Sequence, residues 1–270
     1  MLRRVRELQG YTIGATDGDI GRVTDLYFDD DSWTIRSFVV DTGTWLPGRM
    51  VLISPASILG IDTPGLRLQT DLTRRRVEES PSVDTSRPVS RQHEVAAARH
   101  YGHPYYWMGP YRWGPLAYPG AAVPPPGASA HQGLTTEEIT AREREWADPS
   151  LRSVNAVHGY TIEATDGRLG HVEDFLIDEQ SWTIRYLVID PRSWWPGPHV
   201  IVSTEWLEDV RWSDSAVVVN VTREAVRNAP RYETRGPLPR EFETRLHGHY
   251  RRPGYWERPP EAWILRPPAA

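Results

Sequence analysis

The chain has 270 residues, 39% of them hydrophobic and 25% charged, which is enough for two small domains. It has no cysteine, which excludes disulfides, thiolate metal sites and a cysteine nucleophile and is typical of a reducing compartment. A formal net charge of −5 argues against non-specific electrostatic binding of nucleic acid. We find neither a signal peptide nor an apolar run near the ~20 residues that cross a bilayer. We therefore expect a cytoplasmic protein, soluble or peripheral on the cytoplasmic face of a membrane.

An internal repeat organises the sequence. Gly10 matches Gly159, and the same offset of 149 residues continues without insertion or deletion to Trp107 and Trp256. An ungapped likeness of this length indicates a duplicated module. Two copies are too few for a solenoid, so each copy is expected to bury its own core or to pair with the other.

Each copy begins with a predicted β hairpin. An Asp-Gly pair, at 17–18 and again at 166–167, lies between short apolar segments, and glycine accepts the positive φ of such a turn. The apolar positions of the next strand break strict alternation, which predicts a bulge near Asp25 and Asp174.

Strands dominate the rest of each copy. Residues 33–41 and 182–190 are rich in β-branched and aromatic side chains, as central strands buried on both faces are. Turns with proline and glycine separate them from further short strands. About five or six short strands in roughly 70 residues suit a small barrel better than a sandwich. The predicted fold is mainly β, with two small closed antiparallel barrels, each followed by short helices.

Helices and a linker complete the predicted organisation. Thr73 and Thr222 are plausible N-caps of short helices, and a second helical piece follows in each copy. Residues 108–130 are rich in proline and glycine, which predicts an extended linker, with a short helix after it. The predicted segments are a first barrel (1–81), its helical and aromatic tail (82–107), the linker with its helix (108–155), a second barrel (156–230), and the second tail with a C-terminal extension (231–270).

The pattern D-G-x-x-G-x-V-x-D, followed by I-R-x-x-V-x-D, resembles the PRC-barrel domain, the family of the cytoplasmic barrel of the photosynthetic reaction-centre H subunit. The resemblance implies a small antiparallel barrel that docks onto larger assemblies rather than one that turns over a substrate. The residues that carry it are Asp17, Gly18, Gly21, Val23, Asp25, Asp29, Ile35, Arg36, Val39 and Asp41, with Asp166, Gly167, Gly170, Asp174, Arg185 and Asp190 in the second copy.

The arginine of this motif lies in an apolar strand, where a guanidinium needs an acidic partner. For Arg36 we expect Asp25 or Asp41 as the partner. The equivalent partners of Arg185 are Asp174 and Asp190. A salt bridge within the barrel is the expected role, and ligand binding is the alternative.

The sequence contains no catalytic or nucleotide-binding motif, so we predict a protein that is not an enzyme and has no catalytic, cofactor or metal site. The acidic run 29–31 lacks the spacing and the closing glutamate of a calcium loop. The histidine pairs 100/103 and 247/249 lack flanking residues that would complete a metal ligand set.

Aromatic residues are the strongest functional lead. The chain has 12 Trp and 12 Tyr against 4 Phe, a preference for rings with a polar group, which are enriched at protein interfaces. Those at 105–107 could fold back on their own barrel, whereas those at 111, 113 and 118 have no counterpart in the repeat and are expected to reach a partner. The candidate interface residues are Tyr105, Tyr106, Trp107, Tyr111, Trp113 and Tyr118, with Trp45, Trp194 and Trp195 at loop tips.

We therefore predict a non-enzymatic scaffold subunit, a peripheral component of a membrane-bound complex such as a photosynthetic reaction-centre and light-harvesting assembly. Its expected partners are other protein subunits, with no DNA and no cofactor. The alternatives are a ribosome- or RNA-associated assembly factor, and a small-ligand or stress-response module with a cleft between the barrels. Positions that differ between the copies, such as Ser37 and Tyr186, are where functional differences are expected.

Overall fold

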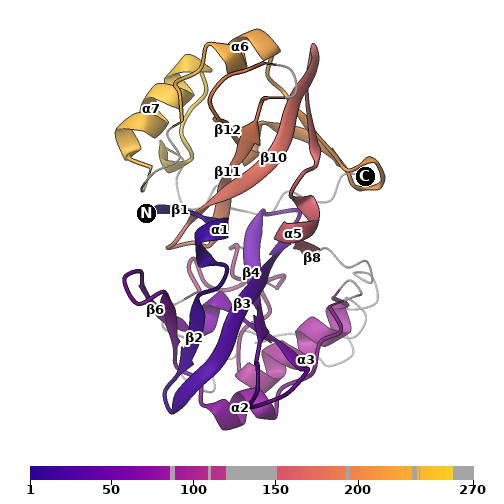
Figure 1. The fold of residues 1–270 in the computed structure, drawn as a ribbon, viewed down its shortest axis with the longest axis vertical. Helices are drawn as coiled ribbons and strands as arrows, with labels where there is room; N and C mark the ends of the chain where they lie inside the picture. Colours follow the sequence, from indigo (N-terminus) through magenta and orange to yellow (C-terminus); the bar gives the residue numbers. More distant parts are fainter. Residues whose placement is uncertain are drawn as a thin grey trace. The chain divides into compact units, whose positions relative to one another are not determined.

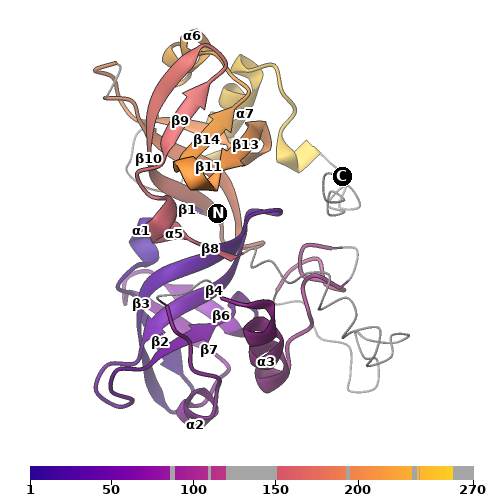
Figure 2. The same ribbon diagram turned by 90° about the vertical axis from the view of Figure 1, so that its right-hand side faces the viewer.

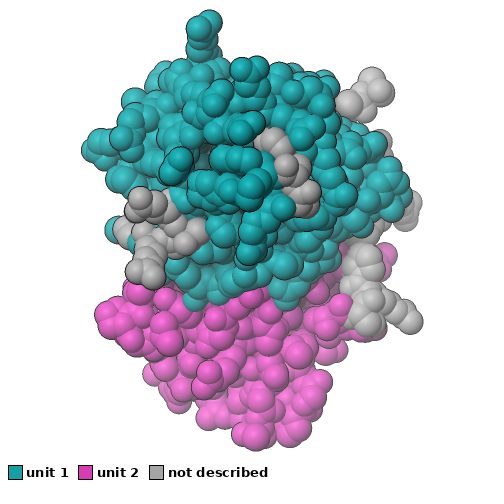
Figure 3. Space-filling model, turned by 45° about the horizontal axis from the view of Figure 1, so that its top comes forward, with its two compact units in different colours: residues 1–7, 153–259 teal, residues 8–152, 260–270 magenta. Residues whose placement is uncertain are grey.

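The computed structural model describes residues 1–85, 89–108, 111–119, 151–192, 195–232, 236 and 238–257. The chain divides into two compact units, coloured separately in Figure 3. Residues 8–152 and 260–270 form the unit that we call the first-repeat unit (magenta). Residues 1–7 and 153–259 form the second-repeat unit (teal). Among the described residues, no helix combines the length and the apolar character that a membrane crossing requires.

Strands form the framework of the first-repeat unit (Figure 1). They are paired in the order β6-β7-β2-β3-β4-β5, and β8 adds to β3. The β2–β7 pair is parallel, and the other recorded pairs in this order are antiparallel. The strands are β2 (Thr12–Ala15), β3 (Gly18–Asp29), β4 (Thr34–Asp41), β5 (Met50–Ile53), β6 (Ile58–Asp62), β7 (Arg67–Thr70) and β8 (Leu151–Ser153).

The second-repeat unit has the same plan, and Figure 2 shows its strands β9, β14 and β13 in the foreground. The order is β13-β14-β9-β10-β11-β12, and β1 adds to β10. Its strands are β1 (Leu2–Arg4), β9 (Thr161–Ala164), β10 (Gly167–Asp178), β11 (Thr183–Asp190), β12 (Val200–Ser203), β13 (Leu207–Arg211) and β14 (Ala216–Val219). The prediction of a mainly β fold is confirmed.

The prediction of closed barrels is not confirmed, because the sheet is open in the part of the chain that is described. In the first-repeat unit, β5 and β6 stand at opposite ends of the strand order and do not pair. A short helical turn, η1 (Pro55–Ser57), lies between them, and Pro55 has no N–H group for a strand ladder. The chain therefore turns a corner after β5, and β6 pairs with β7 instead. A turn at Thr204–Trp206, η2, separates β12 from β13 in the same way.

The predicted hairpins and bulges are present in both copies. Ala15 pairs with Gly18, whose φ of +147° explains the glycine, and the register shifts between Val23 and Asp25. The second copy repeats the hairpin and the bulge. Gly21 is required for another reason, since a Cβ there would collide with the carbonyl group of Asp41.

The Asp-Gly turn of each copy also holds the short helix that follows the strands. The helix α2 (Arg74–Glu78) has Thr73 as its N-cap, as predicted, and Asp17 Oδ1 accepts a hydrogen bond of 2.8 Å from the backbone N–H of Arg74. Thr222 caps α6 (Arg223–Arg227) in the same manner. The longer helices α3 (Arg91–Tyr101) and α7 (Arg240–His249) are the second helical pieces that the sequence predicts.

The central strands form the core, as expected. Six of the eight residues of β4 are buried, and seven of the eight residues of β11 are buried. The predicted helix of the linker, most of the linker itself and the C-terminal extension lie outside the described residues.

The first strand of each repeat is exchanged between the units. We expected residues 1–7 in the first barrel, but β1 pairs with β10, and the helical turn α1 (Val5–Leu8) follows it. The corresponding strand of the second copy, β8, pairs with β3, and its Leu151 packs with Tyr27, Val39 and Leu52. The helical turn α5 (Val154–Val157) follows β8 in the same way. The division of the sequence into the predicted segments otherwise stays a prediction.

Ion pairs hold both exchanged strands at equivalent positions. Arg3 pairs with Glu179 in the second-repeat unit, and Arg152 Nε lies 2.7 Å from Asp30 Oδ2 in the first-repeat unit. The second-repeat unit has a further pair, in which Arg4 Nε donates to Oδ2 of the buried Asp174 at 2.6 Å. The residue equivalent to Arg4 in the second copy is Ser153, which carries no charge.

We predict that Arg4→Ala destabilises the second-repeat unit selectively. Removing Arg4 leaves the Asp174 carboxylate buried without its cation, a change that costs about 3 kcal/mol in comparable cases. Hydrogen exchange of β10 and β11 amides under native conditions measures this cost, with the amides of β3 and β4 as the internal reference. The control is Arg6→Ala, because Arg6 is half exposed and pairs with Glu173 at the surface. Equal effects of the two variants on β10 would contradict the prediction.

Candidate functional site

A buried arginine lies at the centre of each repeat. Arg36, on β4, has a side chain that is 2% exposed, and its NH2 group donates to Asp29 Oδ2 at 2.8 Å. Our prediction of Asp25 or Asp41 as its partner is therefore wrong. Those two carboxylates accept hydrogen bonds from nearby backbone N–H groups instead, those of Leu26 and Gly43.

A second bulge explains this choice of partner. Tyr27 pairs with Ser37 and Phe28 pairs with Ile35, so Arg36 is the additional residue of the bulge. An additional residue re-aims its side chain relative to regular alternation. Here the guanidinium reaches the Asp29–Ser32 turn, where it also bonds to Ser32 Oγ at 3.0 Å.

The same bulge recurs at Arg185, with a looser ion pair. Arg185 NH2 lies 3.7 Å from Asp178 Oδ2, whereas we had expected Asp174 or Asp190. Asp174 is bound by Arg4, and Asp190 by Arg192 at the surface. Burial lowers the pKa of Arg185. In the first copy, burial alone would raise the pKa of Asp29, but Arg36 outweighs it and the pKa lies below its ordinary value.

A chain of side chains links this arginine to α3. The Arg36 guanidinium lies 3.7 Å from the centroid of the Tyr106 ring, and the Tyr106 hydroxyl donates to Glu94 Oε1 at 2.7 Å. Arg91 NH1 lies 2.9 Å from Glu94 Oε2 and also stacks on Trp107, 4.3 Å from that ring. We call these five residues the arginine–aromatic stack. They fasten the helix and the aromatic tail to the sheet.

The stack recurs in the second-repeat unit. Arg185 lies 4.0 Å from the Tyr255 ring, Arg240 NH1 lies 3.0 Å from Glu243 Oε2, and Arg240 lies 4.3 Å from the Trp256 ring. Its presence in both copies makes it a structural part of the module. Arg91 and Glu94 were not among the predicted site residues, although their recurrence at the offset of 149 residues is a signal that could have found them.

Several candidate interface residues pack on their own unit. Tyr105 is 4% exposed and belongs to a cluster with Val95 and Met108. Trp113 is 5% exposed and lies 5.0 Å from Arg36, contrary to our expectation that it reaches a partner. Both side chains therefore pack on their own unit.

The remaining candidates are more accessible. Tyr118 is 44% exposed, and Tyr111 is half-buried in a short bridge with Gly114. Trp45 is half-buried and donates its indole N–H to the carbonyl of Ile20. Trp195 is half-buried, whereas Trp194 lies outside the described residues. The role of these residues in binding a partner stays a prediction.

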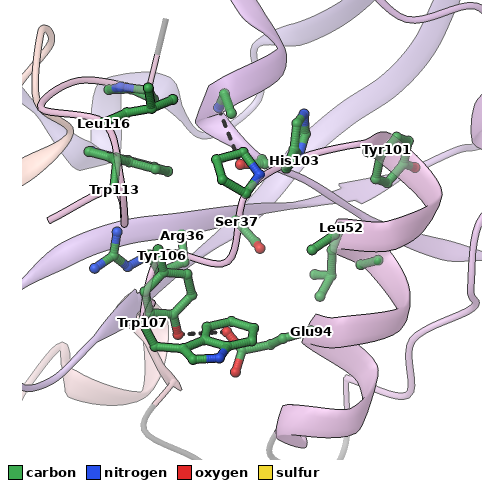
Figure 4. A pocket seen from close by; sticks show the side chains of 16 residues that line it. Arg36, Ser37, Leu52, Glu94, Tyr101, His103, Tyr106, Trp107, Trp113 and Leu116 are labelled. Atoms are coloured by element: carbon green, nitrogen blue, oxygen red, sulfur yellow. Dashed lines mark hydrogen bonds between the residues drawn. The ribbon is translucent and has the colours of Figure 1, made fainter. Parts of the chain in front are cut away.

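A pocket opens beside the stack in the first-repeat unit, between β4, α3 and the segments 103–107 and 113–119 (Figure 4). Its cavity volume is about 60 Å³. The pocket is therefore shallow and open. Its walls combine apolar side chains with a few polar groups, namely Arg36, Ser37, Leu52, Ser54, Ala56, Glu94, Ala97, Ala98, Tyr101, His103, Pro104, Tyr106, Trp107, Trp113, Leu116 and Pro119.

Comparison with known families identifies this part of the chain. Residues 2–75 match the family model of the PRC-barrel domain. This segment is a PRC-barrel domain. The match covers the strands of the first repeat up to α2, and the second repeat has the same strand order. No curated protein matches the chain.

Three large side chains of the second repeat are small in this PRC-barrel repeat, and two of the small residues, Ser37 and Ala98, line the pocket. The equivalents of Tyr186, Trp206 and His247 are Ser37, Ser57 and Ala98. In the second repeat the Tyr186 hydroxyl lies 3.0 Å from Glu243 Oε1 and 2.9 Å from His247 Nε2, and the side chain is fully buried. The first repeat keeps the glutamate and lacks the tyrosine.

Burial shifts the titration of two groups that line the pocket. It raises the pKa of Glu94 to about 7, although the Arg91 guanidinium opposes the shift. It lowers the pKa of His103 to about 4. His103 Nε2 lies 3.0 Å from Ser57 Oγ, where the second repeat has the tryptophan.

The acidic run that we considered as a cation site is already neutralised in part. Asp29, Asp30 and Asp31 offer carboxylate oxygens within 4.8 Å of one another. Arg36 binds Asp29, and Arg152 binds Asp30. We therefore assign no cation site to this acidic cluster.

The histidines at 100, 103, 247 and 249 lie within hydrogen-bonding distance of neighbouring groups. His100 and His249 occupy equivalent positions, and their Nε2 atoms lie close to the carbonyl oxygens of Arg76 and Ala225. They tie the longer helix of each copy to the shorter one.

We predict that the contribution of Glu94 to the stability of the first-repeat unit falls as the pH rises from 4.5 to 7. A carboxyl group with a raised pKa binds more protons in the folded state, so its contribution is complete below pH 4.5 and is lost through pH 7. The full contribution of Glu94 is about 3 kcal/mol. His103 acts in the opposite direction between pH 4 and 6.5, because its pKa is lowered.

The measurement is the difference between wild type and Glu94→Gln in denaturant-induced unfolding at pH 5 and pH 7.5. The His103 contribution is common to both proteins and cancels. Wild type should lose more stability than Glu94→Gln across this range. Parallel profiles would show that Glu94 titrates normally.

Proposed function

We propose that the chain is a non-enzymatic protein-interaction module and that its first repeat carries the docking surface. The family match to the PRC-barrel domain suggests a role in protein interaction. The observation that carries the proposal is an apolar edge on one repeat only. Leu59 is 70% exposed and Leu66 is 56% exposed, and both belong to the β6–β7 hairpin.

The second repeat has polar residues at the same positions. Leu59 corresponds to Glu208, and Leu66 corresponds to Ser215. Both β6 and β13 stand at an end of the strand order and carry a bulge near these positions. An edge strand offers unpaired backbone groups, and charged side chains are a common protection against unwanted pairing. At position 59 the first repeat has an exposed leucine in place of this charge, which favours a partner that covers it.

The finer proposal is a peripheral subunit of a membrane-bound photosynthetic reaction-centre and light-harvesting complex. Its support is the resemblance to the family of the reaction-centre H subunit, and the chain must then act on the cytoplasmic side. Separation of native membranes tests it. A chain that co-purifies with pigment–protein complexes and is released by high salt would favour it, whereas co-sedimentation with ribosomal subunits would favour the RNA-associated alternative.

The test of the docking surface uses the residues of the second repeat as replacements. In Leu59→Glu/Leu66→Ser, each lost leucine removes about 1.5–3 kcal/mol of apolar burial, so recovery of the partner should fall at least tenfold. Cross-linking and mass spectrometry of the tagged chain in its native extract identify the partner and measure its recovery. The matched control is Glu208→Gln, which changes the equivalent exposed position. A wild-type chain that sediments as a free monomer would overturn the proposal.

A small-ligand binding module is the second candidate, and the pocket beside the stack favours it. The cleft that we expected for it was one between the barrels, whereas the pocket lies within the first-repeat unit. Its shallow form makes it better suited to one group of a larger molecule than to an enclosed ligand.

A further inference from the structure

We infer that the pocket of the first repeat receives a tyrosine side chain from a partner protein. The inference rests on the proposed interaction function and names the chemistry of the partner. Its internal precedent is Tyr186, which the second repeat itself inserts at the equivalent place.

The acceptor for the tyrosine hydroxyl is retained in the first repeat. Glu94 is the equivalent of Glu243, to which the Tyr186 hydroxyl donates at 3.0 Å. A carboxylate has about four lone-pair sites, and Tyr106 and Arg91 approach one oxygen each. One further donor can therefore bind Glu94 without displacing either neighbour.

The surroundings of Glu94 select a neutral donor. Arg91 is ion-paired with Glu94, and the nearby Arg36 is ion-paired with Asp29, so the charges around the site already balance. A lysine or arginine from the partner would add a third positive charge to a buried site. A phenol offers a hydroxyl donor without that charge.

The walls and the depth of the pocket suit one ring that enters from the mouth. Leu52, Trp107 and Leu116 provide apolar surface on different sides (Figure 4). The cavity volume of about 60 Å³ is well below the roughly 150 Å³ that encloses a free benzene. A ring held at the mouth by a protein backbone matches this geometry better than a free molecule.

The experiment titrates the full chain with N-acetyl-tyrosinamide and with N-acetyl-phenylalaninamide, followed by NMR of the labelled protein. The tyrosine compound should bind about tenfold more tightly, because the phenylalanine compound buries Glu94 without supplying a hydrogen bond. Shifts should be confined to the amides of Ser37, Glu94 and Ala98 and their neighbours. Equal binding of both compounds, or no binding, would overturn the inference.

A filled-pocket variant locates the site. Ser37→Tyr/Ala98→His installs the residues of the second repeat, and it should abolish binding of the tyrosine compound. If this variant does not fold, Ala98→Leu narrows the pocket from the helix side and should weaken binding at least tenfold. The matched control is Glu208→Gln, which should leave binding unchanged.

Two arms separate this inference from the proposed function. Loss of the partner in Leu59→Glu/Leu66→Ser together with failure of the tyrosine compound would retain the docking surface and reject the pocket. Binding of the tyrosine compound with no partner in the native extract would reject the docking function. If p-cresol binds and the tyrosine compound does not, the occupant is a free phenol and the inference is wrong.

Discussion

The structure of each repeat depends on one buried guanidinium in the central strand. Burial of a charge is tolerated only where the charge is paired and its hydrogen-bonding groups are met. Arg36 is paired with Asp29, donates to the carbonyl oxygen of Arg112 at 2.6 Å and stacks on the ring of Tyr106, while its buried Nε has no hydrogen-bond partner among the described residues. The bulge that aims the arginine and the aromatic tail that covers it are both consequences of this requirement.

The two copies share this framework and differ beside it. The stack uses Tyr106 and Glu94 in one copy and Tyr255 and Glu243 in the other, so the helix is held in the same way. The framework is present with either residue at the neighbouring position, which is Ser37 in the first repeat and the buried Tyr186 in the second. A position that the framework does not need is free to acquire a binding role.

The features that could be predicted from the sequence are those that depend on a few neighbouring residues. The Asp-Gly hairpins, the bulge near Asp25 and the caps at Thr73 and Thr222 each depend on a few adjacent residues. The partner of Arg36 could not be predicted, because the second bulge leaves no trace in the alternation of an apolar strand. The sheet is open because the chain turns after β5 and β6 pairs with β7. The direction of this turn depends on contacts with residues that are distant in the sequence. The sequence signalled the pocket only through the difference between Ser37 and Tyr186, and the wall of the pocket also depends on a further difference, at Ala98.

The exchange of β1 and β8 gives the tandem arrangement a physical reason. The PRC-barrel match begins at residue 2, yet β1 completes the second-repeat unit, and β8 supplies the Leu151 and Arg152 contacts of the first. Exchange of an identical element between copies is a low-cost rearrangement, because each copy regains the contacts that it gives up. The second-repeat unit therefore combines β1 from the start of the chain with the strands β9 to β14, and no continuous segment contains all its strands. Selection can keep both copies in the chain for stability, while the surface and pocket of one copy diverge for binding.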